Sequence, residues 1–144
     1  MRHGLGAIVI DYLGMLGDDY GKNPYERISY ISRKIKELAR IVNVPVIVAH
    51  QLSRELEKRD DKRPQLFDLR DSGNIEQDAD IVLFLYRESY YNKDENKDTG
   101  MTEIIIAKQR QGDAGKFIKV YYDKLTQAYY NSKPSDGEQP SLVI

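Results

Sequence analysis

The stretch Ile8-Val9-Ile10-Asp11-Tyr12 decides the fold of this chain, because an uninterrupted apolar run meets a single carboxylate there. Gly6 and Gly14 bound the run on either side. A short, continuous run rich in Ile and Val between glycines is typical of a strand that is buried on both faces, as in parallel sheets. We therefore predict a buried strand over residues 7–13, with Asp11 carried toward its carboxyl end.

A long amphipathic helix and a second buried strand follow in the sequence. The helix start combines a capping amide, a proline in the first helical position and a glutamate at the third, at Asn23, Pro24 and Glu26. Apolar residues then recur at helical spacing as far as Val42, opposite a charged face. Asn43 and Pro45 end the helix, and residues 46–49 form the next apolar run. Two strands joined by a helix and short turns predict a right-handed βαβ unit and an at least partly parallel sheet.

Further strands are predicted toward the carboxyl end of the chain, at residues 81–86, 102–107, 117–122 and, as an edge strand, 129–130. Gly112 and Gly115 permit a tight reversal between two of them. From Ser132 onward the composition turns to Lys, Pro, Ser, Asp, Gly, Glu and Gln, which favours a flexible tail. We predict one folded domain over residues 1–131 and a tail over residues 132–144.

Composition excludes several kinds of site. The chain has 144 residues, 40% of them hydrophobic and 31% charged, with a net charge of −1, no cysteine and two histidines. Disulfides, thiolate zinc sites and cysteine nucleophiles are thereby excluded. No apolar run approaches the roughly 18 residues of a membrane span, so we expect a cytoplasmic protein without a membrane partner. With a net charge near zero, any contact with nucleic acid is expected at a local loop or groove.

Polar residues follow each of the predicted inner strands. Open α/β sheets bind ligands at the carboxyl ends of their parallel strands, and those ends carry Asp11, His50-Gln51, Arg87-Glu88 and Lys108-Gln109-Arg110. We expect these residues to gather at one edge, where a phosphorylated ligand would lie. An aspartate there can hold the Mg²⁺ of a nucleotide, and an uncharged amide such as Gln51 can sense a terminal phosphate or orient water. The phosphate-loop pattern G-x-x-x-x-G-K-S/T is absent from the 144 residues, so the chain carries half of a nucleotide site.

Each of these motifs also has a purely structural interpretation, and residues alone leave both open. Asp11 can be a strand-end carboxylate that accepts backbone N–H groups. Lys108 and Arg110 can be a solvated hairpin tip, or an arginine finger that reaches a phosphate on another subunit. Residues 69–74 can be an ordinary connector, or a loop whose guanidinium and backbone N–H groups meet a phosphate chain.

Four ordered blocks of sequence, at residues 8–13, 44–54, 63–64 with 68–80, and 107–112, resemble the C-terminal motor domain of DnaB-type replicative helicases. These helicases are RecA-like P-loop ATPases. The resemblance implies an α/β fold: a RecA-like P-loop NTPase core with a mostly parallel sheet flanked by helices and a C-terminal antiparallel hairpin. It also implies a core truncated at its N-terminal side, since the phosphate loop lies before the first of these blocks in the family.

The same resemblance implies roles for individual residues. Asp11 matches the Walker B carboxylate that holds Mg²⁺, and Gln51 matches the sensor of the γ-phosphate. Lys108 and Arg110 match the basic pair inserted into the ATP site of the neighbouring subunit. The loop that follows one strand of nucleic acid through the central pore matches Arg70, Asp71 and Gly73.

The function implied by the resemblance is that of a homo-hexameric ring. Such rings couple ATP hydrolysis, with ATP and Mg²⁺ as cofactors, to translocation on single-stranded DNA and duplex unwinding during DNA replication. A primase or a helicase loader would be a further partner. Asp71 stands where the family usually has Glu, so a contact made by the backbone should survive better there than one made by the side chain.

The missing phosphate loop leads to two expectations for the 144 residues themselves. Without a phosphate loop, the isolated chain should be inactive as an ATPase. An apolar sheet face or strand edge, normally covered by the phosphate-loop strand and helix, should be exposed. The alternatives are a non-enzymatic module that binds single-stranded DNA or caps a helicase ring, and another RecA-like ATPase such as a recombinase.

Overall fold

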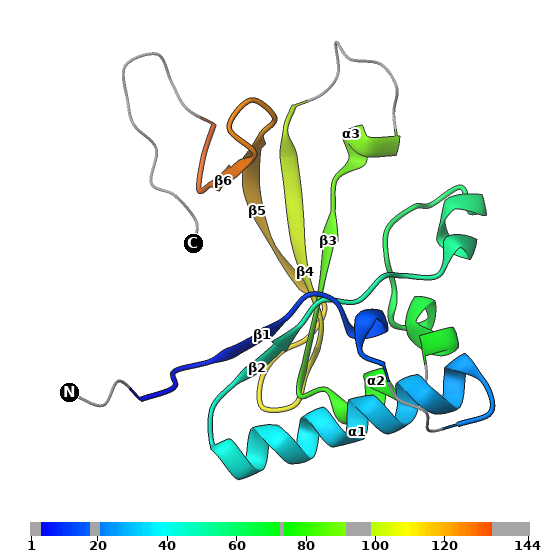
Figure 1. The fold of residues 1–144 in the computed structure, drawn as a ribbon. Coiled ribbons are helices and arrows are strands. Elements are labelled where there is room, and N and C mark those ends of the chain that lie inside the picture. Colours follow the sequence, from blue (N-terminus) through cyan, green and yellow to red (C-terminus); the bar gives the residue numbers. More distant parts are fainter. Residues whose placement is uncertain (1–3, 18–20, 73, 92–98, 134–144) are drawn as a thin grey trace. The chain divides into compact units, whose positions relative to one another are not determined.

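The computed structural model describes residues 4–17, 21–72, 74–91 and 99–133 of the chain (Figure 1). By their contacts the residues form two compact units, each taken by itself below. The first unit combines residues 1–58 with residues 66–79, and the second combines residues 59–65 with residues 80–144. The segment 59–65 therefore belongs to the second unit although residues on both sides of it belong to the first.

A parallel strand pair with a long helix forms the framework of the first unit. Strands β1 (Ile8–Ile10) and β2 (Val46–Val48) pair in parallel, with Ile8 opposite Val46 and Ile10 opposite Val48. Helix α1 (Pro24–Val42) connects them and follows a short 3-10 turn, η1 (Leu13–Met15). The predicted strand–helix–strand order and its parallel pairing are confirmed, with both strands shorter than the apolar runs that contain them.

Local capping chemistry sets both ends of α1. The Asn23 side chain accepts a hydrogen bond from the backbone N–H of Glu26 at 2.9 Å. The Glu26 carboxylate accepts one from the backbone N–H of Lys22 at 2.8 Å, one residue before the cap. At the other end Asn43 takes the left-handed conformation at φ 52°, which stops the helix. The predicted helix start and stop are both confirmed.

The core of the first unit lies beneath α1. Leu13, Ile28 and Ile31 are buried together, and half-buried apolar residues that include Val48 and Ile75 pack against them. Three short helical segments complete the unit: η2 (Arg54–Lys58), η3 (Leu66–Ser72) and α2 (Ile75–Asp78). The buried hydroxyl of Ser32 donates a hydrogen bond of 2.8 Å to the Asp78 carboxylate, which ties α1 to α2.

An antiparallel sheet forms the second unit. It contains β3 (Ile81–Tyr86), β4 (Met101–Gln109), β5 (Lys116–Asp123) and β6 (Ala128–Tyr130), in the order β3-β4-β5-β6. One helical turn, α3 (Glu88–Tyr91), follows β3. The α/β fold class is confirmed, and the antiparallel part is larger than the predicted hairpin because β3 also pairs antiparallel with β4.

Apolar side chains lie exposed on strands of both units. Val9 and Ile47 occupy the middle positions of β1 and β2 and are 70% and 59% exposed. On β3 every second residue is more than half exposed, at Ile81, Leu83 and Leu85. The intervening residues Val82 and Phe84 are buried. The expectation of an exposed apolar face is therefore confirmed, whereas the prediction that the strands within residues 7–13 and 46–49 are buried is wrong, since no residue of β1 or β2 is fully buried.

Arg63 attaches the segment 59–65 to the antiparallel sheet of its own unit. Its Nη1 lies 2.5 Å from Oε2 of Glu103 on β4, as an ion pair rather than an aligned hydrogen bond. The guanidinium carbon lies 5.0 Å from the ring centre of Phe117 and 5.7 Å from that of Tyr86, within cation–π range. One side chain thus contacts residues of three strands, β3, β4 and β5.

Replacing Arg63 by alanine is expected to lower the free energy of unfolding by about 2 kcal/mol. The substitution leaves the carboxylate of Glu103, whose side chain is 18% exposed, without its cation. The expected loss is below that of a fully buried pair because the Arg63 side chain is itself 36% exposed. Urea denaturation of the 144-residue chain measures it.

A matched control is the ion pair between Lys116 and Asp113, whose side chains are 68% and 77% exposed. Lys116→Ala should change stability by less than about 0.5 kcal/mol, since exposed pairs contribute little. Equal, small losses in both variants would mean that Arg63 is not an anchor of this sheet.

Candidate functional site

Two predicted site residues follow the carboxyl ends of the paired strands β1 and β2. The backbone N–H of Ala49 donates to the Ile10 carbonyl, and that of Leu13 donates to the Ala49 carbonyl, both at 2.9 Å. The segments that leave the two strands therefore run from one edge of the sheet. Asp11 follows β1 directly and Gln51 follows β2 after two residues, so the parallel register places both at this edge.

The side chains at this edge fit a magnesium ion whose ligands are mostly nucleotide phosphate oxygens and water, with few from the protein. Asp11 and Gln51 are both exposed. Among the described residues no three carboxylate, histidine or cysteine side chains gather closely enough to form a metal cage. Protein Mg²⁺ sites commonly use one or two carboxylates, with water and substrate phosphates completing the octahedron. A single strand-end carboxylate such as Asp11 fits that coordination.

His50 lies between the strand and Gln51 and is half-buried. Burial lowers the pKa of His50, because the charged imidazolium loses its hydration. Its Nδ1 is buried and has no hydrogen-bond partner among the described residues. With His50 neutral, Asp11 is the charged residue among those that directly follow β1 and β2, since Ala49 and Gln51 carry no charge.

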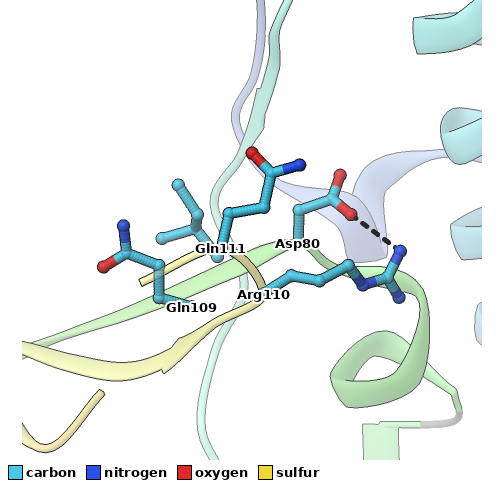
Figure 2. Close-up of a pocket in the computed structure, with 5 residues that line it drawn as sticks. Asp80, Gln109, Arg110 and Gln111 are labelled. Atoms are coloured by element: carbon cyan, nitrogen blue, oxygen red, sulfur yellow. Dashed lines mark ion pairs between the residues drawn. The ribbon is translucent and has the colours of Figure 1, made fainter. Parts of the chain in front are cut away.

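The second cluster lies at the carboxyl end of β4, where Arg110 meets Asp80 (Figure 2). The backbone N–H of Arg110 donates to the Asp80 carbonyl at 2.9 Å, and Nη1 of Arg110 lies 3.0 Å from Oδ1 of Asp80. Gln109 points away from this ion pair. A pocket of about 330 Å³ is lined here by Asp80, Ile81, Gln109, Arg110 and Gln111. Lys108 is still part of β4, opposite Val82.

The expectation that all four strand ends share one edge is wrong. In the antiparallel register Ile81 lies opposite Gln109 and Tyr86 lies opposite Glu103. Arg87-Glu88 therefore follow β3 at one end of the sheet, and residues 108–110 lie at the other end. The reason is direction: neighbouring antiparallel strands place their carboxyl ends at opposite edges.

Asp80 is the residue that sequence reasoning missed as part of a site. It stands 30 positions before Arg110, and no spacing rule connects the two. The signal that would have found it is the antiparallel pairing of β3 with β4. That pairing places Asp80, which precedes β3, beside Arg110, which follows β4.

The segment predicted to follow DNA lies partly in η3. The backbone of Arg70 and Asp71 belongs to this 3-10 helix, and Gly73 lies outside the described residues. Asp68 and Leu69, just before them, are 5% and 4% exposed. The backbone N–H of Ser53 donates to the Asp68 carbonyl at 3.3 Å. The part of η3 that precedes Arg70 is therefore packed within the first unit.

Comparison with known proteins gives a consistent result. A sequence profile of the family described as DnaB-like helicase C terminal domain matches residues 1–131. Replicative DNA helicase DnaB of Geobacillus stearothermophilus is 58% identical over 125 residues, covering 82% of this chain and 27% of that protein. Replicative DNA helicase DnaC of Bacillus subtilis is 54% identical over 124 residues, with the same two shares. The chain thus spans little more than a quarter of these relatives.

Solved structures agree with the sequence relatives. One solved ATPase domain superposes with a TM-score of 0.80 at 42% identity, covering 88% of this chain and 44% of that one. A DnaB-like replicative helicase, solved to describe its interactions with primase, superposes with a TM-score of 0.73 at 44% identity. That match covers 82% of this chain and 29% of the other. In the part of the chain that the structure describes, no helix is long and apolar enough to cross a bilayer.

Proposed function

The chain belongs to the DnaB-like helicase C terminal domain family, and we propose on that premise that it is part of a replicative helicase motor. In the complete protein this motor couples ATP hydrolysis to translocation on single-stranded DNA and to duplex unwinding. The observation that carries the proposal is the parallel β1–β2 register, which supports a shared role for Asp11 and Gln51 at one edge.

Each residue at the β1–β2 edge receives a proposed task. Asp11 holds Mg²⁺ through water or directly, and the ion supplies charge neutralisation on the nucleotide phosphates when it is bound. The Gln51 amide meets the terminal phosphate or the attacking water without adding like charge. His50, whose pKa is lowered by burial, is neutral at pH 7 and adds no positive charge at this edge.

Lys108 and Arg110 are proposed to act on the nucleotide of a neighbouring subunit in a homo-hexameric ring. A guanidinium keeps its charge at every physiological pH and presents several N–H donors to phosphate oxygens. The half-exposed side chain of Arg110, just beyond the end of β4, is suited to such a contact. One solved relative is described with its interactions with primase, so primase is a proposed partner of the full helicase, and a loader is another.

A chimeric helicase tests the proposal directly. The aligned part of this chain, 82% of its length, would replace its counterpart in the Geobacillus stearothermophilus helicase, which is 58% identical there. Retained ATP hydrolysis stimulated by single-stranded DNA, together with retained unwinding of a forked duplex, is expected. A folded, hexameric chimera that neither hydrolyses ATP nor unwinds would contradict the proposed function.

Binding of single-stranded DNA is proposed for Arg70, Asp71 and Gly73. Arg70→Ala is expected to weaken binding of a fluorescein-labelled oligo(dT) by about tenfold in low salt, because one cation that meets the phosphate chain is lost. The slope of log K against log salt should fall by about 0.7, the value for one phosphate of a single strand. Fluorescence anisotropy of the chimera over a salt series measures both.

The control for Arg70 is Arg33→Ala, which removes the same charge from the exposed face of α1. Its affinity should stay within about twofold of the parent. If Arg33→Ala and Arg70→Ala weaken binding equally, the effect reflects net charge and the pore-loop assignment is wrong.

A further inference from the structure

The ion pair between Asp80 and Arg110 gives the guanidinium a carboxylate partner just before the start of β3. We propose that Asp80 is a positioning residue that holds Arg110 against the start of β3 and yields it to a phosphate. This inference rests on the proposed function of Arg110 at the nucleotide of a neighbouring subunit. The evidence for it is the geometry of two distinct contacts between the same two residues.

The two contacts have separable consequences. The backbone N–H of Arg110 donates to the Asp80 carbonyl at 2.9 Å, and this bond fixes the main chain whatever the side chains do. The contact of 3.0 Å between Nη1 and Oδ1 joins the two side chains and helps to orient the guanidinium (Figure 2). The side-chain pair can therefore break while the hairpin keeps its place on β3.

The exposure of the pair makes such an exchange easy. The side chains of Arg110 and Asp80 are 51% and 54% exposed. Ion pairs in water at this exposure contribute little, because the high dielectric and the lost side-chain entropy offset their attraction. A phosphate group brings more negative charge and more acceptor oxygens than one carboxylate, so it competes well for the same guanidinium.

The lining of the pocket balances one negative charge against one positive charge. Of the five residues that line it, Asp80 is the one acid and Arg110 the one base. The others are the amides Gln109 and Gln111 and the apolar Ile81. Neutralising Asp80 therefore turns the pocket lining from balanced to positive, which should strengthen its attraction for phosphate.

The first experiment observes Arg110 in the 144-residue chain by NMR, with pyrophosphate as the probe. The Nε–Hε resonance of Arg110 is assigned by its disappearance in Arg110→Lys. In Asp80→Asn, this resonance should move toward the position of a free arginine, and the pyrophosphate dissociation constant should fall by about two- to fivefold. Asp80→Glu keeps the carboxylate and should restore the weaker binding.

Asp113→Asn is the matched control, since it removes one carboxylate from the same hairpin, where Asp113 pairs with Lys116. It should change neither the Arg110 resonance nor the dissociation constant. Unchanged backbone amide resonances away from the hairpin establish that each variant is folded. The proposal is overturned if Asp80→Asn leaves pyrophosphate binding unchanged or weaker, or if pyrophosphate shifts the Arg110 resonance in neither protein.

Steady-state kinetics of the chimera separate this inference from the proposed function. Asp80→Asn should raise kcat/KM for ATP by about two- to fivefold through a lower KM, as a competitor of the nucleotide is removed. Arg110→Ala should abolish most turnover. Full turnover in Arg110→Ala refutes the proposed function of Arg110, whereas an inactive Arg110→Ala with an unchanged KM in Asp80→Asn refutes only the role of Asp80.

Discussion

The kcat for ATP hydrolysis by the chimeric helicase is expected to fall by at least about a hundredfold when Asp11 is replaced by asparagine. The amide keeps the size of the side chain and removes the charge that holds Mg²⁺. Bound metal and aligned cations supply several kcal/mol of transition-state stabilisation in phosphoryl transfer, and each 1.4 kcal/mol corresponds to a factor of about ten. Measuring kcat by coupled assay over a Mg²⁺ series tests this directly.

Stability should hardly change in the same variant, because Asp11 is exposed and no metal cage surrounds it among the described residues. A melting temperature within about 2 °C of the parent would separate a lost metal contact from lost structure. Asp113→Asn, a carboxylate on the hairpin surface, serves as the control and should retain full turnover. A kcat for Asp11→Asn within about threefold of the parent would mean that Asp11 is a structural strand-end carboxylate.

The 144-residue chain by itself is expected to show no ATP turnover above background, since its sequence contains no phosphate-loop pattern. The backbone cradle and lysine of that loop carry much of the transition-state stabilisation. Robust hydrolysis by this chain that Asp11→Asn abolishes would overturn the half-site interpretation. Inactivity of the chain together with activity of the chimera would favour a motor segment over a free-standing DNA-binding module.

The largest expected loss of stability comes from Gly100→Ala, at about 2–4 kcal/mol. Gly100 has a φ of +67°, a conformation that costs an L-residue about 1–2 kcal/mol. A Cβ atom there would lie 2.5 Å from the Tyr121 ring and 2.6 Å from the Tyr122 carbonyl oxygen. The backbone cannot yield easily, because the Tyr122 N–H donates to the Gly100 carbonyl at 2.7 Å. Overpacking therefore adds to the conformational strain.

Gly115→Ala separates the two causes of that loss. Gly115 has a φ of +80°, but no atom lies within 4 Å of the position that its Cβ would take. Its alanine variant should lose only the conformational part, about 1–2 kcal/mol. Urea denaturation of both variants of the 144-residue chain measures the difference. Equal losses would show that the contact with Tyr121 and Tyr122 does not constrain position 100.

Residues 8–51 illustrate what local sequence determines in this protein. The apolar runs fixed β1 and β2, and the capping groups at Asn23 and Asn43 fixed the helix between them. Each of these signals acts over a few residues. A helix between two strands joined by short turns then favours parallel pairing, so the common edge of Asp11 and Gln51 followed from the sequence.

The tertiary structure alone decided the arrangement of the antiparallel sheet and its contacts. The run at residues 81–86 predicts a strand whichever direction its neighbour takes, and only the observed pairing with β4 places Asp80 beside Arg110. Arg63 and Glu103 likewise meet across 40 positions of sequence. A run of apolar, β-branched residues predicts a strand from residues that are adjacent in the sequence. Direction and register depend on which distant strand is its neighbour, so the charged pairs that they create cannot be read from spacing.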